Sequence, residues 1–528
     1  MKKIILFSIT LVLSIYVVQG QTRKLEMTLY AISNLYVDKV DKEKLEEDAI
    51  TALLAALDPH SDYLTKEEVR EMNEPLQGNF EGIGIQFNML TDTLYVAQVI
   101  VGGPSQKVGL LAGDRIIEVN DTLIAGVKMK NTDIMKRLRG TKGTTVRVKV
   151  LRQRVAELIE FNIVRDKIPI YSMEAAYMLN DSIGYISISR FASSTHEEFV
   201  TAFIDLKMQG MKSLILDLQG NGGGYLGTAA SLCNEFLSKE QLIVYTEGAN
   251  QEREDLKATR SGLFETGKLV VLIDETSASA SEILSGAIQD WDRGVVIGRR
   301  SFGKGLVQRP IPLPDESMLK LTTARYYTPA GRCIQRPYEK GKEEIYYKDL
   351  SERYKHGELM HADSIQFPDS LKYSTLINKR TVYGGGGIMP DYFIPLDTSK
   401  YTSWHRNIVA KGVLNRVNLN YVDANRDKIK AEYGTFDNYQ KRYGTPESLL
   451  EDLKKAALAD SIPFKEEEYN RSKSLLKLQL KAITARDVFE RNEYYIRIIN
   501  EDNESLSKAV MILTRPEEYD KAIKNNLK

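Results

Sequence analysis

Short apolar runs alternate with amphipathic stretches through the middle of the chain, and this spacing predicts an α/β core. Residues 183–188, 214–218 and 269–273 are runs rich in apolar and β-branched residues, so each is predicted to form a strand of a sheet. Residues 197–208 lie between two of these runs and are predicted to form a helix. Strands that alternate with helices are typical of a largely parallel sheet covered by helices.

The flanking regions have other textures and are predicted to be separate parts of a multidomain α/β protein. Residues 77–166 combine short strands with glycine turns, which predicts a β domain inserted before a core of residues 167–397. Residues 24–75 carry apolar residues at helical spacing. Residues 398–528 are charged, rich in leucine and poor in glycine, so both ends of the chain are predicted to be helical.

The candidate chemistry begins directly after the predicted strand 269–273, in the run Thr-Ser-Ala-Ser-Ala-Ser-Glu of residues 276–282. Ser279 is expected to open a helix over residues 280–291. A serine hydroxyl placed there lies beside the unpaired N–H groups of the first helical turn, which can stabilise an oxyanion. The same serine and Glu282 also form the pattern of a capping box, which is the purely structural interpretation.

One alternative for the nucleophile remains open at this stage. Other serines of the same run or helix are rival nucleophiles, and spacing alone does not exclude them: Ser277, Ser281 and Ser285.

A serine also needs an adjacent base. The nearest candidate is Lys304, in a glycine-flanked loop after a predicted strand at 295–297. Lysine acts as a base only when neutral, so burial must lower its pKa from about 10.4. The amide of Gln308 can orient the amine without adding charge.

These residues resemble the C-terminal processing peptidases, which are Ser/Lys proteases of the tail-specific type with a crotonase-like core. The family carries its nucleophile as the first serine of an Ala-Ser-Ala-Ser-Glu run. Its lysine lies in a Phe-Gly-Lys-Gly loop, with a glutamine four residues later. The resemblance implies that Ser279 is the nucleophile, Lys304 the general base and Gln308 its partner. It also implies peptide hydrolysis through an acyl-enzyme, without a metal or another cofactor.

A second constellation of the family is the glycine-rich turn after the predicted strand 214–218. The family turn is usually Asp-Leu-Arg-x-Asn-Pro-Gly-Gly, whereas here Gln219 replaces the arginine and Gly222 the proline. The resemblance implies an oxyanion hole made of the N–H of Ala280 and the N–H of Gly223 or Gly224. Which glycine donates stays open.

The same turn also matches a dinucleotide-binding fingerprint. Gly222, Gly224 and Gly227 have the spacing Gly-x-Gly-x-x-Gly, and Glu247 ends the next predicted strand. A lone match of this kind is weak, and an exported protein has little access to nucleotide cofactors. The dinucleotide interpretation is therefore not favoured.

Residues 77–166 resemble a PDZ domain, most specifically in the phrase Gly-Asp-x-Ile-x-x-Val-Asn over 113–120. Backbone N–H groups around Gly82, Ile83 and Gly84 are expected to hold a terminal carboxylate while the peptide adds a strand to the sheet. The expected partners are therefore proteins or peptides with free, apolar C-termini. The alternative function is a catalytically silent PDZ scaffold that only binds peptides.

The N-terminus and the overall charge bear on location. Lys2 and Lys3 precede an apolar run over residues 4–18, so residues 1–20 are predicted to be a signal peptide, with a retained anchor as the alternative. We therefore expect an exported, periplasmic protein that is soluble or peripherally associated with the membrane. With 72 basic and 72 acidic residues, the chain shows no electrostatic signature of nucleic-acid binding.

The remaining features carry no chemistry in the sequence. The family phrase Gly-Ile-x-Pro-Asp occurs later in this chain than in the family, because a polar, tyrosine-rich stretch precedes it. Residues 336–383 are therefore predicted to be an insertion of unknown purpose. Its residues His356 and His361 are predicted to lie on the surface. Whether Cys233 and Cys333 pair stays open. The helical ends of the chain are candidates for oligomerisation or for docking an adaptor.

Overall fold

The computed structural model describes residues 23–90, 92–153 and 155–524. The predicted signal peptide, residues 1–20, lies outside the described residues. Across the described ranges, none of the helices combines the length and the apolar character that crossing a membrane requires.

The core is built on a six-stranded sheet that is parallel except at one edge. In spatial order its strands are β10 (Met173–Met178), β11 (Ile183–Ile188), β12 (Ser213–Asp217), β15 (Leu269–Ile273), β16 (Val295–Gly298) and β21 (Tyr392–Phe393). Only the β10–β11 pair is antiparallel. The predicted largely parallel sheet is therefore confirmed.

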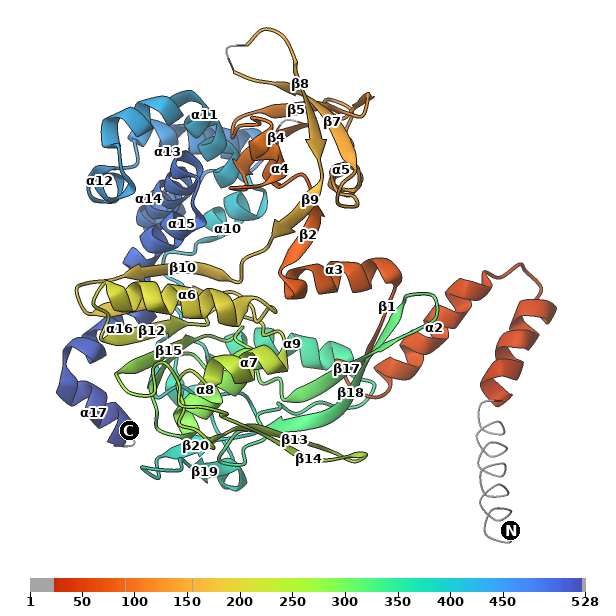
Figure 1. Cartoon of the computed structure of the whole chain (residues 1–528), viewed down its shortest axis with the longest axis vertical. Helices are drawn as coiled ribbons and strands as arrows, with labels where there is room; N and C mark the ends of the chain where they lie inside the picture. Colours follow the sequence, from red (N-terminus) through yellow and green to blue (C-terminus); the bar gives the residue numbers. More distant parts are fainter. Residues whose placement is uncertain (1–22, 91, 154, 525–528) are drawn as a thin grey trace.

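Helices cover both faces of this sheet (Figure 1). One face carries α6 (Thr195–Met208), α7 (Leu226–Cys233) and α8 (Ala280–Asp290), and the other carries α16 (Glu504–Thr514) and α17 (Pro516–Lys524). Successive strand residues point to opposite faces. Ile186 and Leu216 accordingly pack with the first set of helices, and Tyr185 and Ile215 with the second. The end of the chain is thus part of the core.

A second, antiparallel sheet lies beside the first. It contains β1 (Asp62–Leu64), β18 (Met318–Tyr327), β13 (Leu242–Gly248) and β14 (Gln251–Lys257), and β17 (Leu306–Pro312) pairs with β18. Strands β17 and β18 form an antiparallel hairpin in which Gln308 lies opposite Thr322. Because β1 pairs with β18, the N-terminal turn before β1 is brought to the strands that follow Lys304.

The inserted β domain forms its own six-stranded sheet. Its strands are β3 (Ile85–Leu90), β4 (Thr93–Val99), β5 (Arg115–Val119), β7 (Thr145–Leu151) and β8 (Ile159–Val164), with β6 (Thr122–Leu123) beside β5 and helices α4 (Pro104–Lys107) and α5 (Asn131–Leu138). A two-stranded ribbon of β2 (Asn79–Gly82) and β9 (Asp166–Pro169) joins this domain to the core, as Figure 1 shows.

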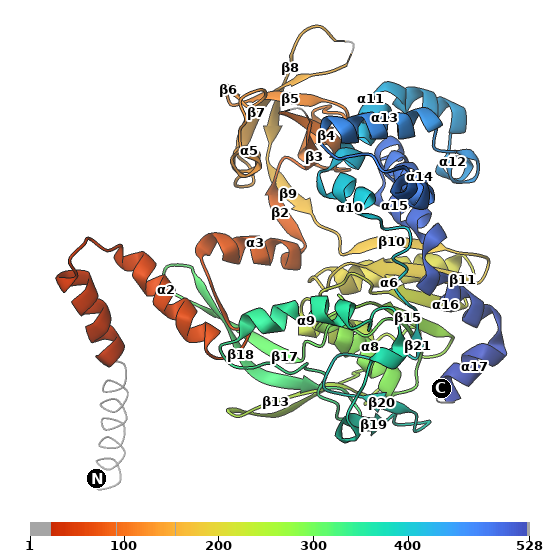
Figure 2. The ribbon, with the colours of Figure 1, turned by 180° about the vertical axis from the view of Figure 1, so that it is seen from behind.

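A helical bundle packs against the inserted domain (Figure 2). It consists of α10 (Ser403–Ala410), α11 (Val413–Tyr433), α12 (Phe436–Arg442), α13 (Glu447–Ala459), α14 (Glu466–Phe489) and α15 (Asn492–Ile499). Arg115 Nη2 lies 2.7 Å from Asp423 Oδ2, and Gln98 Nε2 donates to the carbonyl oxygen of Glu490 at 2.6 Å. The predicted helical character of residues 398–528 is confirmed.

The N-terminal part is helical as predicted, but its first helix does not pack on the body. It spans residues 23–35, stands apart from the rest of the chain and exposes Leu25 and Leu35 (Figure 1). Helices α2 (Lys42–Ala55) and α3 (Lys66–Gln77) follow.

The segment 336–383 is ordered and contains α9 (Glu343–Lys355), the short helices η1 (Ala362–Ser364) and η2 (Asp369–Leu371), and the hairpin β19 (Lys372–Ser374) with β20 (Thr381–Tyr383). Its helix α9 lies against the core in both views of the ribbon (Figures 1 and 2).

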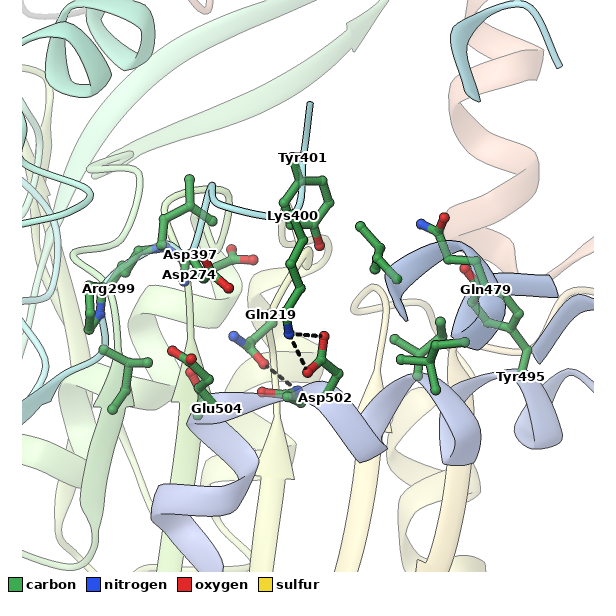
Figure 3. Close-up of a pocket in the computed structure, with 18 residues that line it drawn as sticks. Gln219, Asp274, Arg299, Asp397, Lys400, Tyr401, Gln479, Tyr495, Asp502 and Glu504 are labelled. Carbon is green, nitrogen blue, oxygen red and sulfur yellow. Dashed lines mark hydrogen bonds and ion pairs between the residues drawn. The ribbon is translucent and has the colours of Figure 1, made fainter. Parts of the chain in front are cut away.

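A cavity of about 460 Å³ separates the carboxyl ends of the parallel strands from the bundle (Figure 3). Gln219 and Asp274 line it from the loops after β12 and β15. Lys400 and Asp502 form an ion pair of 2.7 Å at its wall, and Asn503 Nδ2 donates to Gln219 Oε1 at 3.2 Å. Polar contacts thus attach the C-terminal helices to the core around this cavity.

Candidate active site

Ser279 occupies the turn between β15 and α8, directly before the first residue of that helix. Its backbone has φ +55° and ψ −112°, a conformation that L-residues rarely adopt and that is typical of functional turns. Its side chain is partly exposed, and its main-chain N–H donates to Glu282 Oε2 at 2.8 Å. The predicted position of Ser279 at the opening of a helix is confirmed.

The other serines of this region are buried and have hydrogen-bond acceptors. The hydroxyl of Ser277 donates to the carbonyl oxygen of Leu218 at 2.8 Å. The hydroxyl of Ser281 donates to the carbonyl oxygen of Asn221 at 2.9 Å, and that of Ser285 to the carbonyl oxygen of Ser281 at 2.7 Å. These three hydroxyls therefore hold neighbouring main-chain segments in place.

Glu282 links the serine turn to the lysine loop. In addition to the N–H of Ser279, the carboxylate accepts from Lys304 N at 2.9 Å, Gly303 N at 2.7 Å and Ser301 Oγ at 2.5 Å. Burial raises the pKa of this carboxyl to about 7, although the four hydrogen bonds oppose the shift. The sequence indicated only the capping role of Glu282, because the bonds to residues 301–304 depend on the tertiary fold.

Lys304 is partly buried in the loop between β16 and β17. Burial, followed by the charge of Lys320, lowers the pKa of its amine to about 8, while Glu282 and Asp58 oppose the shift. The direction is the one that a lysine general base requires.

Tyr326 contacts both parts of the site through one hydroxyl. This hydroxyl lies 3.2 Å from the carbonyl oxygen of Ser279 and also contacts the carbonyl oxygen of Lys304. This contact joins residues distant in the chain, so no local pattern of the sequence indicates it.

Gln308 lies on β17, opposite Thr322 of β18. Its Nε2 donates to the carbonyl oxygen of Leu306 at 3.2 Å and to Thr322 Oγ1 at 3.3 Å. The amide is therefore held by the hairpin, and the expected contact with the amine of Lys304 is not among these bonds.

The turn before β1 reaches the same place, which the sequence did not reveal. Asp58 Oδ1 accepts from Thr322 Oγ1 at 3.0 Å, and Ser61 Oγ accepts from Thr322 N at 3.0 Å. His60 is buried, and burial together with the charge of Lys304 lowers the pKa of its imidazole to about 3.

The glycine turn after β12 packs closely against the serine. Gly223 has φ +104°, and a Cβ atom at this position would lie 2.8 Å from Ser279 Cβ and 3.1 Å from Ala280 N. The N–H of Gly223 donates to Asn221 Oδ1 at 2.8 Å. Gly224 forms an isolated parallel bridge with Phe191. The turn thus lies beside the first N–H groups of α8.

The dinucleotide alternative finds no support in this arrangement. The fingerprint requires the acidic residue to end the next strand of the same parallel sheet. Glu247 instead lies in β13, which pairs with β14 and β18 in the antiparallel sheet.

The predicted carboxylate loop of the inserted domain lies between β2 and β3. The carbonyl oxygen of Ile83 accepts from Ser105 N and Oγ at 3.0 and 2.6 Å, and that of Gly84 accepts from Ile100 N at 3.0 Å. Gly82 ends β2 at the ribbon. β3 is the last strand in the order of its sheet, which is the kind of strand to which a peptide can add.

The remaining sequence candidates are apart from this site. His356 and His361 are exposed, as expected. Cys233 is buried, Cys333 is partly buried, and both are free thiols. Over residues 23–90, 92–153 and 155–524, no three histidine, cysteine or acidic side chains are grouped as metal ligands would be.

Comparison with protein families gives three matches along the chain. Residues 182–341 match peptidase family S41, and residues 82–163 match the PDZ domain. Residues 404–490, most of the helical bundle, match a family of unknown function.

Curated relatives agree with these matches. The carboxy-terminal processing protease CtpB of Bacillus subtilis is 35% identical over 316 residues, which cover 59% of this chain and 65% of that protein. The carboxy-terminal-processing protease of Bartonella bacilliformis is 38% identical over 307 residues, 57% of this chain and 69% of that protein. The photosystem II D1 C-terminal processing protease, a solved structure, is 29% identical, with a TM-score of 0.33, and the match covers 58% of this chain and 83% of that one.

The chain is therefore an S41-type peptidase with an inserted PDZ domain. Within that class it belongs to the family of carboxy-terminal processing proteases.

Proposed function

We propose that this protein is a serine endopeptidase that cleaves polypeptides near their C-termini with Ser279 as nucleophile and Lys304 as general base. One observation carries the proposal: a single carboxylate oxygen, Glu282 Oε2, accepts from the main-chain N–H groups of both Ser279 and Lys304. The two residues belong to separate loops, and one buried carboxylate oxygen holds the main chain of each. Proton transfer between a serine and its base requires that the two residues be held in a fixed relation.

In the proposed reaction, neutral Lys304 takes the proton of the Ser279 hydroxyl as its oxygen attacks the scissile carbonyl carbon. The protonated lysine then gives this proton to the leaving amine, which departs and leaves an acyl-enzyme. Lys304 next removes a proton from water, and the resulting attack releases the new C-terminus and restores the serine. The lowered pKa of Lys304, about 8, supports its role as the base.

The proposed oxyanion hole consists of the N–H of Ala280 and an N–H from Gly223 or Gly224. The close packing of Gly223 on Ser279 and Ala280 supports this placement. Since the N–H of Gly223 also donates to Asn221 Oδ1, use of that donor would require the bond to be exchanged on substrate binding. Gln308 is proposed to border the lysine side of the site through the β17–β18 hairpin.

The PDZ domain is proposed to select chains by a free, apolar C-terminus, which would lie along β3 with its carboxylate at Gly82, Ile83 and Gly84. The open edge of β3 supports this mode of binding. Export to the periplasm completes the proposal and rests on the basic and apolar pattern of residues 1–20.

The test uses an unstructured polypeptide with an apolar C-terminal tail, incubated with the purified protein and followed by mass spectrometry. Wild type is compared with Ser279→Ala, with Lys304→Ala and with Ser281→Ala, the last of which retains the proposed nucleophile. A second substrate with an amidated C-terminus tests the carboxylate site.

We expect fragments from wild type and from Ser281→Ala, none from the other two variants, and slower cleavage of the amidated substrate. Fragments from Ser279→Ala would assign the reaction to another serine or to a contaminant. Intact substrate with every variant, combined with binding of the free tail, would indicate the peptide-binding scaffold.

A further inference from the structure

The loop that carries Lys304 receives several of its hydrogen bonds from the segment 336–383. Buried carbonyl groups need donors. One side chain of α9 supplies the donors for two carbonyl groups of this loop. Arg353 Nη2 donates to the carbonyl oxygen of Arg300 at 2.8 Å, and Arg353 Nη1 donates to that of Ser301 at 3.1 Å. Arg353 is only 3% exposed, so its guanidinium is buried against these carbonyl groups.

The environment of Arg353 is unusual for a surface insertion. Burial and the charge of Arg300 lower the pKa of the Arg353 guanidinium to about 10. The carboxylate of Glu358 opposes this shift, with its Oε2 atom 3.4 Å from Arg353 Nε. Burying a guanidinium is costly unless its donors are used. Here two of its nitrogens serve the main chain of the lysine loop, and the planar fork of arginine, which lysine lacks, fits adjacent carbonyls.

The first turns of α9 hold the other end of the same loop. The hydroxyl of Tyr346 accepts from Gln335 Nε2 at 3.2 Å, and Gln335 Oε1 accepts from Gly305 N at 2.8 Å. The guanidinium of Arg336 lies between the rings of Phe302 and Tyr346, with its carbon 4.0 and 3.9 Å from their centres. Residues 300–305 are therefore contacted at both ends by α9 and by residues 335–336, which precede it.

The same helix also holds the N-terminal turn that borders Lys304. The hydroxyl of Tyr346 lies 2.9 Å from His60 Nε2, and the hydroxyl of Tyr347 donates to the carbonyl oxygen of Pro59 at 2.8 Å. His60 and Lys304 are close enough for the charge of the lysine to lower the pKa of the imidazole.

We propose that α9 of the segment 336–383 is the positioning element of the catalytic lysine, with Arg353 and Tyr346 as its positioning residues. This inference rests on the proposed function of Lys304 as the base. The helix fixes the lysine loop on one side and the turn of His60 on the other, and so keeps the amine partly buried. Without Arg353, two buried carbonyls lack donors, so the loop moves toward water to satisfy them. Exposure of the amine then raises its pKa toward 10.5 and displaces it from Ser279.

The test compares wild type with Arg353→Lys, Arg353→Ala and Tyr346→Phe. The matched control is Lys355→Ala, because Lys355 is exposed on the same helix and pairs only with Glu352 at 2.7 Å. The first readout does not depend on activity: competitive acetylation with acetic anhydride over a pH series, read by mass spectrometry of the Lys304 peptide, gives the pKa of that amine. The second readout is kcat and KM across the same pH range.

We expect an amine pKa near 8 in wild type and in Lys355→Ala, and a higher value in the three other variants. In Arg353→Ala, kcat should fall on the order of 100-fold with KM little changed, because displacement of a reacting group by about 1 Å has that effect. The acid limb of its rate profile should move to higher pH. If Arg353→Ala does not fold, Arg353→Lys and Tyr346→Phe decide the question.

An unchanged pKa of Lys304 and an unchanged kcat in Arg353→Lys and Tyr346→Phe would overturn the inference. Failure of the proposed function has a different signature, since wild type would then not cleave or Ser279→Ala would remain active. The acetylation result reports on α9 in either case.

Discussion

The hydroxyl of Tyr326 lies 3.2 Å from the main-chain carbonyl oxygen of Ser279. The same hydroxyl contacts the carbonyl oxygen of Lys304, and Tyr326 is only 2% exposed. One phenol thus joins the main chains of the two candidate reacting residues, which Glu282 also connects.

Replacing Tyr326 with phenylalanine should lower both stability and turnover. The substitution leaves two buried carbonyl groups with one donor fewer, which costs about 1–3 kcal/mol of unfolding free energy. We expect kcat to fall more than KM rises, because the serine turn and the lysine loop lose a common contact. Urea unfolding and steady-state kinetics measure both effects. Tyr327→Phe is the matched control, since Tyr327 stacks on Tyr245 and should tolerate the change. Equal kinetics in the two variants would contradict this role.

The rate of cleavage should depend on the protonation of Lys304. The pKa of its amine, lowered to about 8 by burial, means that the reactive neutral form increases as pH rises through 8 and is lost below it. A profile of kcat/KM from about pH 4 to 10 should therefore show an acid limb near 8. A profile that is flat down to about pH 4 would rule out a neutral lysine as the base.

Removing the same amine should stabilise the protein at neutral pH. Because the pKa of Lys304 is lower in the folded protein than in the unfolded chain, the unfolded state binds more protons between about pH 8 and 10.5, so stability rises with pH in that window. Below pH 8 the charged amine opposes folding. Lys304→Met should accordingly be more stable than wild type at pH 7, by about 1–3 kcal/mol. Denaturant unfolding at pH 7 and pH 10 tests this, and a gain that does not shrink at the higher pH would contradict it.

Gly223 should not tolerate any side chain. Alanine at this position would combine a strained φ of +104° with contacts of 2.8 Å to Ser279 Cβ and to the carbonyl oxygen of Ala278. We expect Gly223→Ala to lose activity almost completely and to cost at least about 2 kcal/mol of stability. Gly222→Ala is the matched control, since a Cβ there meets no atom within 4 Å and φ is ordinary. Comparable loss in both variants would show that the turn is sensitive for another reason.

The hydrogen bonds that connect Asp58 to Gln308 through Thr322 should stabilise the site and support turnover. Thr322 Oγ1 accepts from Gln308 and donates to Asp58, so Thr322→Val breaks both bonds without changing the size of the side chain. We expect a stability loss of about 1 kcal/mol or more and reduced kcat. Hydrogen exchange at residues 57–64 should increase. The neighbouring Thr323→Val is the control, and an identical exchange pattern in the two variants would refute the connection.

The sequence predicted those parts of the molecule whose signal is local. The apolar run 269–273 is β15 to the residue, and the glycine-flanked lysine and the serine run lie in the loops expected for them. Short apolar runs, glycine turns and family motifs are properties of adjacent residues, so a single sequence carries them.

Contacts between distant segments left no such signal. The bonds between Thr322 and the turn at Asp58 join residues more than two hundred positions apart. The fork of Arg353 on two carbonyls depends on how α9 folds back on the loop, and in the sequence it is one basic residue among many. For the same reason the helical pattern of residues 504–524 gave no sign that α16 and α17 cover a face of the central sheet. The partner of the Gln308 amide likewise depends on the register of the β17–β18 hairpin.

The ribbon of β2 and β9 places the entry and the exit of the PDZ domain side by side, since Gly82 pairs directly with Asp166. A segment with adjoining ends can be removed or replaced without changing the path of the rest of the chain. The proposed recognition of the tail and the proposed hydrolysis of the bond can therefore evolve independently in this architecture. A new selectivity can arrive by recombination of one module, provided that its surface still matches the helical bundle at Asp423.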